Sequence, residues 1–131
     1  MSSSIDSANF QIYTDGSKMN NKTGAAFAVF NSTSCIHSDT FKLSPNNSVF
    51  QAEIFSIMKA CEFLYSSNKI PSHSSCIFYS DSLSAVNLLN KCFVFHDPLS
   101  INCLLSLITL SHKVRFCIRW CKGRRPFGYH W

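Results

Sequence analysis

Three of the seven acidic residues in this 131-residue chain stand where carboxylates can do chemistry. Asp15 and Asp81 each follow a short apolar run that reads as a strand, and Glu53 lies in the first turns of a predicted helix. If the two runs are adjacent parallel strands, the carboxyl ends of those strands bring the three side chains together. Clustered carboxylates repel one another unless a cation neutralises them. Their hard oxygens suit Mg²⁺ or Mn²⁺, and a pair of such ions can support phosphodiester hydrolysis.

Each of the three carboxylates also has an ordinary structural interpretation. Asp15 precedes Gly16, which is a common turn, and Asp81 precedes a predicted helix that it could cap. Glu53 in a first helical turn favours the helix dipole. A purely structural interaction domain therefore stays open as an alternative.

The first half of the chain predicts an antiparallel meander followed by a helix. Strands are predicted at residues 10–15, 24–30 and 35–43, with a polar loop over 16–23 in which Asn20 and Asn21 form the turn. Ser48 and Gln51 have the spacing of a capping box. From there apolar residues recur at helical spacing until Asn68 and Pro71 end the pattern.

The second half alternates strands with helices. Residues 76–79 form a run that is apolar on both faces, as in a central strand, and a helix is predicted at about 83–90. Asp97 and Pro98 are typical of a helix start, before an apolar helix over 99–110 and a final strand over 114–120. This order predicts an α/β fold, a mixed five-stranded sheet with helices packed against it.

The composition predicts one folded domain, since 46% of the residues are hydrophobic and only 15% are charged. No run of about 18 apolar residues occurs, so no membrane span is expected. The polar N-terminus predicts no secretory signal, and we expect an intracellular protein, in the nucleus or cytoplasm, that is not secreted. Seven irregularly spaced cysteines predict reduced thiols rather than disulfides or a zinc site.

The formal net charge is +5, and basic residues crowd the C-terminal end of the chain. They are Lys113, Arg115, Arg119, Lys122, Arg124 and Arg125. This concentration suits a polyanion, although a solvated tail is an equal alternative. We predict a disordered segment at 1–9, a domain at 10–120 and an irregular basic tail at 121–131.

Three short motifs resemble successive motifs of the type 1 ribonuclease H family. They are YTDGSK at 13–18, QAEI at 51–54 and YSDS at 79–82. The sequence of these motifs is most similar to that of the ribonuclease H domain of non-LTR retrotransposons, and the resemblance extends over about residues 10–120. The resemblance implies a sheet of order 3-2-1-4-5, cleavage of the RNA strand of an RNA–DNA hybrid by two metal ions, and a place in a larger retroelement polyprotein.

The resemblance also implies roles for individual residues. Asp15 would bridge two ions, and Glu53 and Asp81 would complete the site of the second. Backbone groups around Gly16 and Ser17 would face the minor groove, where 2′-hydroxyls distinguish RNA from DNA. Further nucleic-acid contacts would come from Ser48, at a phosphate of the DNA strand, and from Arg119, Lys122 and Arg124.

The sequence departs from the family pattern after Trp120. Lys122 stands in place of a proline and Arg124 in place of a histidine, and no acidic residue follows Asp97. We therefore expect the last helix and the fourth carboxylate of the family to be missing, with His130 as a possible substitute ligand. Cleavage would then be poor, and the alternative function is a catalytically impaired, hybrid-binding remnant. Without that helix, we expect exposed apolar side chains at Ile12, Ile77 or Ile118.

Overall fold

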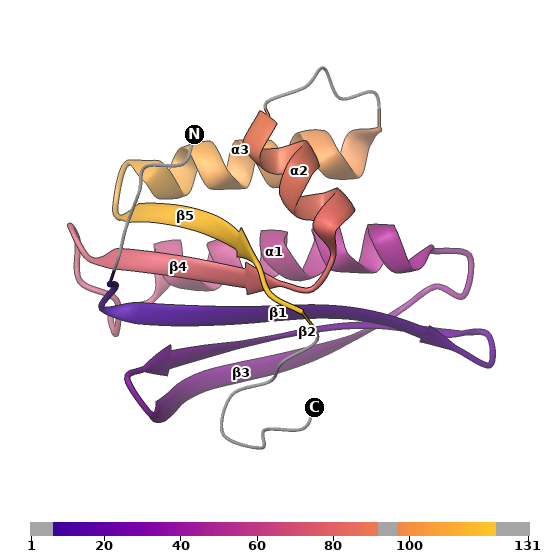
Figure 1. Ribbon diagram of the computed structural model, residues 1–131, viewed down its shortest axis with the longest axis horizontal. Coiled ribbons are helices and arrows are strands. Elements are labelled where there is room, and N and C mark those ends of the chain that lie inside the picture. The colour runs from indigo at the N-terminus through magenta and orange to yellow at the C-terminus, as the bar shows by residue number, and fades with distance from the viewer. Residues whose placement is uncertain (1–6, 92–96, 123–131) are drawn as a thin grey trace.

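A computed structural model describes residues 7–91 and 97–122 of the chain, as a mixed sheet packed against helices (Figure 1). The element order is β1 (Phe10–Met19), β2 (Lys22–Asn31), β3 (Ser34–Leu43), α1 (Val49–Ser66), β4 (Ser75–Ser80), α2 (Leu83–Lys91), α3 (Pro98–Ser111) and β5 (Arg115–Trp120). The five strands lie in the order β3-β2-β1-β4-β5. The predicted fold class and strand order are therefore confirmed.

The first hairpin is longer than the sequence predicts. β1 continues to Met19 and β2 begins at Lys22, so most of the predicted loop over 16–23 is strand. The chain reverses at Asn20 and Asn21, whose φ angles are 52° and 62°. Two consecutive positive φ angles are typical of the tight two-residue turn whose twist matches paired strands. The turn residues were thus predicted correctly, while the loop around them was wrong.

α1 begins as predicted and supplies much of the core. The Ser48 hydroxyl accepts from the backbone of Gln51, and the Gln51 side chain accepts from the backbone of Ser48, which completes the capping box. Ile54 and Ile57 are fully buried on the helix side of the sheet, together with Phe78 of β4. α1 packs across β1 and β2, and it runs behind the sheet in Figure 1.

α3 has the predicted cap, whereas at the start of α2 the Ser82 hydroxyl, and not Asp81, accepts from the backbone of Ala85. Asp97 accepts a hydrogen bond from the backbone of Ser100 and starts α3, which packs on α1. α2 contacts the edge formed by β4 and β5. Within the described part of the chain, no helix is long and apolar enough to cross a membrane.

One expectation about the sheet surface is wrong. Ile12, Ile77 and Ile118 are 0%, 3% and 4% exposed, so none of them forms an exposed apolar patch. Ile12 and Ile118 point into the core shared with α1, as do Phe10 and Phe116, which lie two residues before them on the same strands. Ile77 packs against Cys117 and Tyr79 on the opposite, outer face of the sheet. Residues 1–6 and 123–131 of the predicted terminal segments lie outside the described residues.

Candidate metal centre

The register of β1 and β4 brings two aspartates side by side. These strands pair in parallel from Phe10 opposite Cys76 to Thr14 opposite Ser80. Asp15 and Asp81 are the next residues along the chain, so both lie at the carboxyl end of this parallel pair, the same edge of the sheet. Asp15 does not end its strand as predicted, because β1 continues beyond it paired with β2 alone.

Glu53 reaches the same edge because β1 and α1 approach each other closely at Gly16. A β-carbon placed on Gly16 would lie 2.5 Å from the backbone nitrogen of Glu53 and 2.9 Å from the β-carbon of Ala52. The absence of a side chain therefore admits the helix. The Gly16 backbone N–H donates to Oε1 of Glu53 at 2.9 Å, which ties the carboxylate to the strand that carries Asp15.

The three carboxylates converge. Each of Asp15, Glu53 and Asp81 offers an oxygen, and these oxygens all lie within 4.8 Å of one another. Glu53 is buried, Asp15 is half-buried and Asp81 is exposed. Burial is the main cause that raises the pKa of Glu53 to about 8, helped by the charges of Asp81 and Asp15 and by a hydrogen bond with Asp81, and opposed by the Gly16 N–H.

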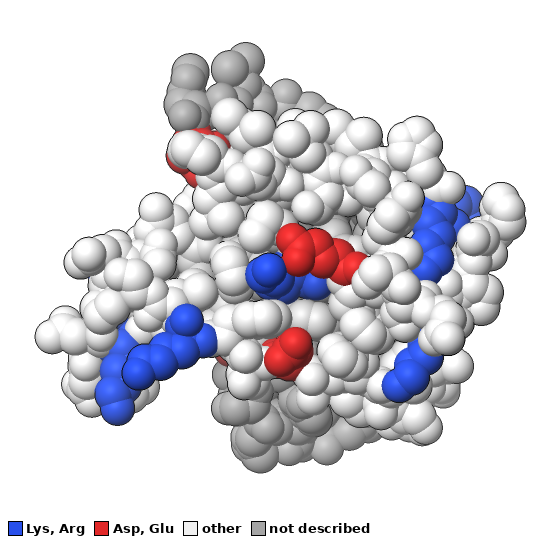
Figure 2. All heavy atoms as spheres, turned by 180° about the vertical axis from the view of Figure 1, so that it is seen from behind, with Lys and Arg blue, Asp and Glu red and all other residues white. Residues whose placement is uncertain are grey.

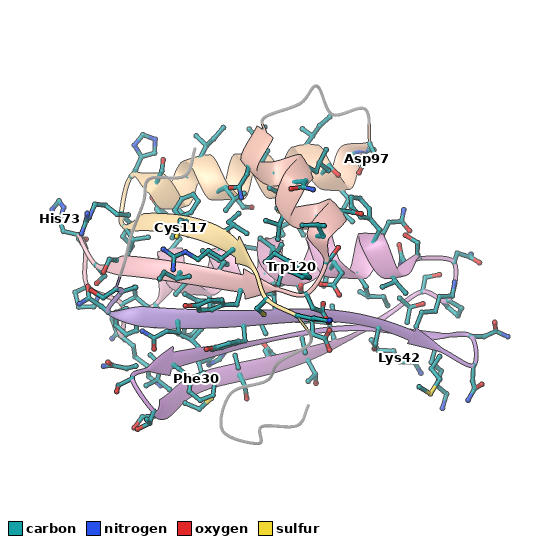
Figure 3. The ribbon with its side chains drawn as sticks, in the orientation of Figure 1. Phe30, Lys42, His73, Asp97, Cys117 and Trp120 are labelled. Atoms are coloured by element: carbon teal, nitrogen blue, oxygen red, sulfur yellow. The ribbon has the colours of Figure 1, made fainter. Side chains whose placement is uncertain are left out.

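Asp81 is held through the residues on either side of it. The buried Ser80 hydroxyl donates to Oε2 of Glu53 at 3.4 Å and accepts from the backbone of Ser82 at 3.1 Å. The backbone of Asp81 is also held from β5, where the indole N–H of Trp120 donates to the Asp81 carbonyl at 3.1 Å. Trp120 lies where β5 ends, beside the end of β4 (Figure 3). Ser80 lies in the motif at 79–82 and Trp120 fits the family pattern, but the sequence gives neither residue this supporting role.

The donor set fits a hard divalent cation. All three groups are carboxylates, the ligands that Mg²⁺ and Mn²⁺ prefer. Burial is the main reason why the pKa of Glu53 is raised, and the negative charges of Asp81 and Asp15 make its ionised form still less favourable without a cation. A bound divalent ion would favour the ionised form of Glu53, because a cation lowers the pKa of the groups around it. The arrangement can therefore hold metal at an open edge, since Asp81 is exposed.

Of the nucleic-acid contacts predicted near this edge, two side chains are exposed, and two of the polar groups already have hydrogen-bond partners within the protein. Ser17 is exposed on the outer face beside Asp15, and the two line one cavity. Ser48 is exposed at the start of α1, where its hydroxyl already serves as the helix cap. The Gly16 N–H is engaged by Glu53. Nucleic-acid binding by these three residues stays a prediction.

The basic residues near the C-terminal end have different surroundings, some on or just beyond β5 and one against the end of α1. Arg119 is half-buried on β5 opposite Tyr79, and Lys122 is exposed just beyond that strand, while Arg124 lies outside the described residues. Lys113, another of these basic residues, is turned toward α1. Its ammonium donates to the carbonyls of Leu64, Tyr65 and Ser67 at 2.7, 3.0 and 2.9 Å, so it holds the C-terminal end of α1.

Known structures share this architecture. No protein-family model and no curated protein matches the sequence. The chain is similar to LC11-RNase H1 in complex with an RNA/DNA hybrid, at a TM-score of 0.72 and 14% identity over 87% of this chain and 86% of that one. It is similar to RNase H1 of Halobacterium salinarum, at 0.70 and 14% over 87% and 86%.

A third similar structure is the N-terminal RNase H domain of rv2228c from Mycobacterium tuberculosis, solved as a fusion with maltose binding protein. Its TM-score is 0.69, with 14% identity over 91% of this chain and 86% of that one. At such identities the likeness concerns the backbone arrangement alone. The strand order and these likenesses together assign the chain to the ribonuclease H fold.

Proposed function

We propose that this protein is a metal-dependent nuclease that cuts the RNA strand of an RNA–DNA hybrid. The observation that carries the proposal is the convergence of Asp15, Glu53 and Asp81 within 4.8 Å at one edge of a ribonuclease H fold. The hybrid is proposed as substrate because one similar structure, LC11-RNase H1, is a complex with an RNA/DNA hybrid. The proposed cofactor is Mg²⁺ or Mn²⁺.

The chain's own residues would orient the ligands. Gly16 and Ser80 hold the two oxygens of Glu53, and Trp120 holds the backbone of Asp81. When bound, divalent ions supply an activated water and neutralise charge at the leaving oxygen. The three carboxylates would hold those ions, and the exposed side of Asp81 leaves room for a phosphodiester to approach.

A cleavage assay on purified protein tests the substrate. End-labelled RNA paired with DNA should be cut internally in Mg²⁺ or Mn²⁺, and chelation should stop the reaction. RNA duplex and DNA duplex of the same sequence should stay intact. Equal cleavage of all three substrates, or cleavage that survives chelation, would contradict the proposal.

A second candidate is a hybrid-binding protein that cleaves weakly. The observation that favours it is the small number of carboxylates at the candidate metal centre. Only three carboxylates are found together within the described residues. This candidate predicts hybrid binding and stabilisation by Mg²⁺ with little cleavage. The purely structural alternative predicts no stabilisation by the ion, so thermal unfolding with and without Mg²⁺ separates the two.

We further infer that the domain derives from a retroelement polyprotein and acts inside the cell. The support is the resemblance of the motifs at 13–18, 51–54 and 79–82 to those of non-LTR retrotransposons. A transcript whose reading frame continues upstream into a reverse transcriptase would agree with this origin. A complete transcript that encodes no other retroelement domain would contradict it.

A further inference from the structure

A groove on the outer face of the sheet begins at Asp15 and runs toward the tip of the β1–β2 hairpin. It consists of two adjoining cavities of about 170 Å³ and about 650 Å³. The smaller contains Asp15, and the larger reaches Lys22 and Lys42. The two cavities share four lining residues, Ser17, Gly24, Thr40 and Phe41. Their continuity connects the carboxylate edge with the basic hairpin.

Strand pairing explains why the groove lies here. Asp15 is opposite Ala26, which is opposite Thr40, and one step further Ser17, Gly24 and Lys42 form the next row across the three strands. Alternation along a strand places these rows on the same face of the sheet. The central position of each row is alanine or glycine, so the middle strand is low between its neighbours.

The far end of the groove is basic. Among the described residues that line it, the cationic ones are Lys18, Lys22 and Lys42, and the only acidic one is Asp15. Lys18 donates to the carbonyls of Pro45 and Asn47, so it braces the loop before α1. Lys22 and Lys42 are exposed. Lys42 lies toward the hairpin end of the sheet (Figure 3), and basic side chains also gather at that end when the molecule is seen from behind (Figure 2).

The spacing suits a polyanion that also reaches the carboxylates. Lys42 lies two residues along and two strands across from Asp15, a backbone separation of about 12 Å from the pleat and strand spacings. A lysine side chain extends toward the solvent from such a position and presents its charge to a passing phosphate. The groove therefore joins a candidate metal centre, where a scissile phosphate would bind, to cations placed a few nucleotides away.

We propose that this groove binds the sugar–phosphate backbone of the strand being cut, with Lys22 and Lys42 contacting phosphates a few nucleotides from the scissile one. The inference rests on the proposed function, because it takes the metal centre as the position of the scissile phosphate. The low middle strand lets the backbone approach the sheet, and the Ser17 and Thr40 hydroxyls beside it can hydrogen-bond to sugar oxygens. The main electrostatic contact then comes from the hairpin rather than from the basic residues near the C-terminal end.

Binding of a fluorescent RNA–DNA hybrid, measured by anisotropy with chelator present, tests the groove without any need for cleavage. The variant is Lys22→Ala/Lys42→Ala, and the matched control is Lys59→Ala/Lys69→Ala, which removes the same charge from α1 and from the loop after it. Loss of two phosphate contacts should make the slope of log affinity against log salt less steep by about 2. The control should keep the wild-type slope.

Lysine acetylation with and without hybrid, read by mass spectrometry, gives a second measurement on the unaltered protein. Lys22 and Lys42 should be protected by the hybrid, while Lys59 and Lys69 should react equally in both samples. Equal slopes for the two double variants, or equal labelling of all four lysines, would overturn the groove while leaving the nuclease proposal standing. A wild-type protein that neither binds nor cuts hybrid would overturn both.

Discussion

Replacement of Gly16 by alanine should separate the strand that carries Asp15 from the helix that carries Glu53. The added β-carbon would meet the Glu53 backbone nitrogen at 2.5 Å, whereas ordinary contacts begin at 3.4 Å, so the helix must retreat by about 1 Å. Both close neighbours at the shortest distances are backbone atoms of α1, which cannot rotate away. The hydrogen bond from Gly16 to Glu53 would lengthen with the same movement.

Gly16→Ala should reduce both the stability of the fold and the rate of cleavage. Overpacking of this kind destabilises a fold by about 1 to 3 kcal/mol, which lowers the melting temperature by roughly 4 °C for each kcal/mol. A displacement of about 1 Å in a catalytic group can reduce the rate on the order of 100-fold. We therefore expect Gly16→Ala to fold, to lose hybrid cleavage by about that factor, and to lose much of its thermal stabilisation by Mg²⁺ or Mn²⁺.

Gly24→Ala is the matched control for folding and metal binding. Its β-carbon would lie 3.4 Å from the Phe41 carbonyl oxygen and 3.7 Å from the Ser17 hydroxyl, both ordinary contacts. The melting temperature and its rise with metal should stay close to those of the wild type. If Gly16→Ala gains as much stability from metal as Gly24→Ala does, the close approach of β1 and α1 does not position the ligands and the reasoning is wrong.

Three further perturbations have defined outcomes. The folded metal-free protein holds the Glu53 proton up to a pKa of about 8, whereas the unfolded chain releases it near 4.5, so the melting temperature should fall as pH rises between these values. Glu53→Gln should flatten this decline, and an equally steep decline in that variant would exclude Glu53 as its source. Trp120→Phe removes the hydrogen bond to the Asp81 carbonyl and should lower kcat with little change in KM. The lost bond should also lower the free energy of unfolding by about 1 kcal/mol. An unchanged kcat would show that Trp120 does not position Asp81. Lys113→Met leaves three carbonyls at the end of α1 without their cation and should cost about 1 to 3 kcal/mol in urea unfolding, whereas Lys69→Met, at an exposed site, should change stability by less than about 0.5 kcal/mol.

The strands and helices could be predicted from the sequence because each depends on local patterns, whereas the strand order 3-2-1-4-5 came from the resemblance to the ribonuclease H family. Apolar alternation and short connections define the strands, and Asp15 and Asp81 come directly after the residues of β1 and β4 that pair in parallel. The helix start at Ser48 placed Glu53 in the first turns of α1. The convergence of the three carboxylates was expected on the condition that β1 and β4 are parallel neighbours, and their pairing meets that condition.

The features that the sequence did not predict depend on contacts between distant residues. The polar segment after Asp15 read as a loop, although strand pairing with residues 22–26 holds it extended. Lys113 shares the parity of Arg115 and Arg119 along the chain, but it precedes β5 and turns to the end of α1. The groove exists only because Gly24 and Ala26 lie between β1 and β3. Neither short-range spacing nor composition contains that information.

The central claim, that three carboxylates hold divalent ions for cleavage, is tested most directly by comparing hybrid cleavage by the wild type and by Asp15→Asn in Mg²⁺ and in Mn²⁺. The substitution keeps the shape of the side chain but removes the charge of one of the three ligands. We predict that the variant folds, that cleavage is abolished with either ion, and that the rise in melting temperature on adding the ion is greatly reduced. Undiminished cleavage by Asp15→Asn would contradict the account.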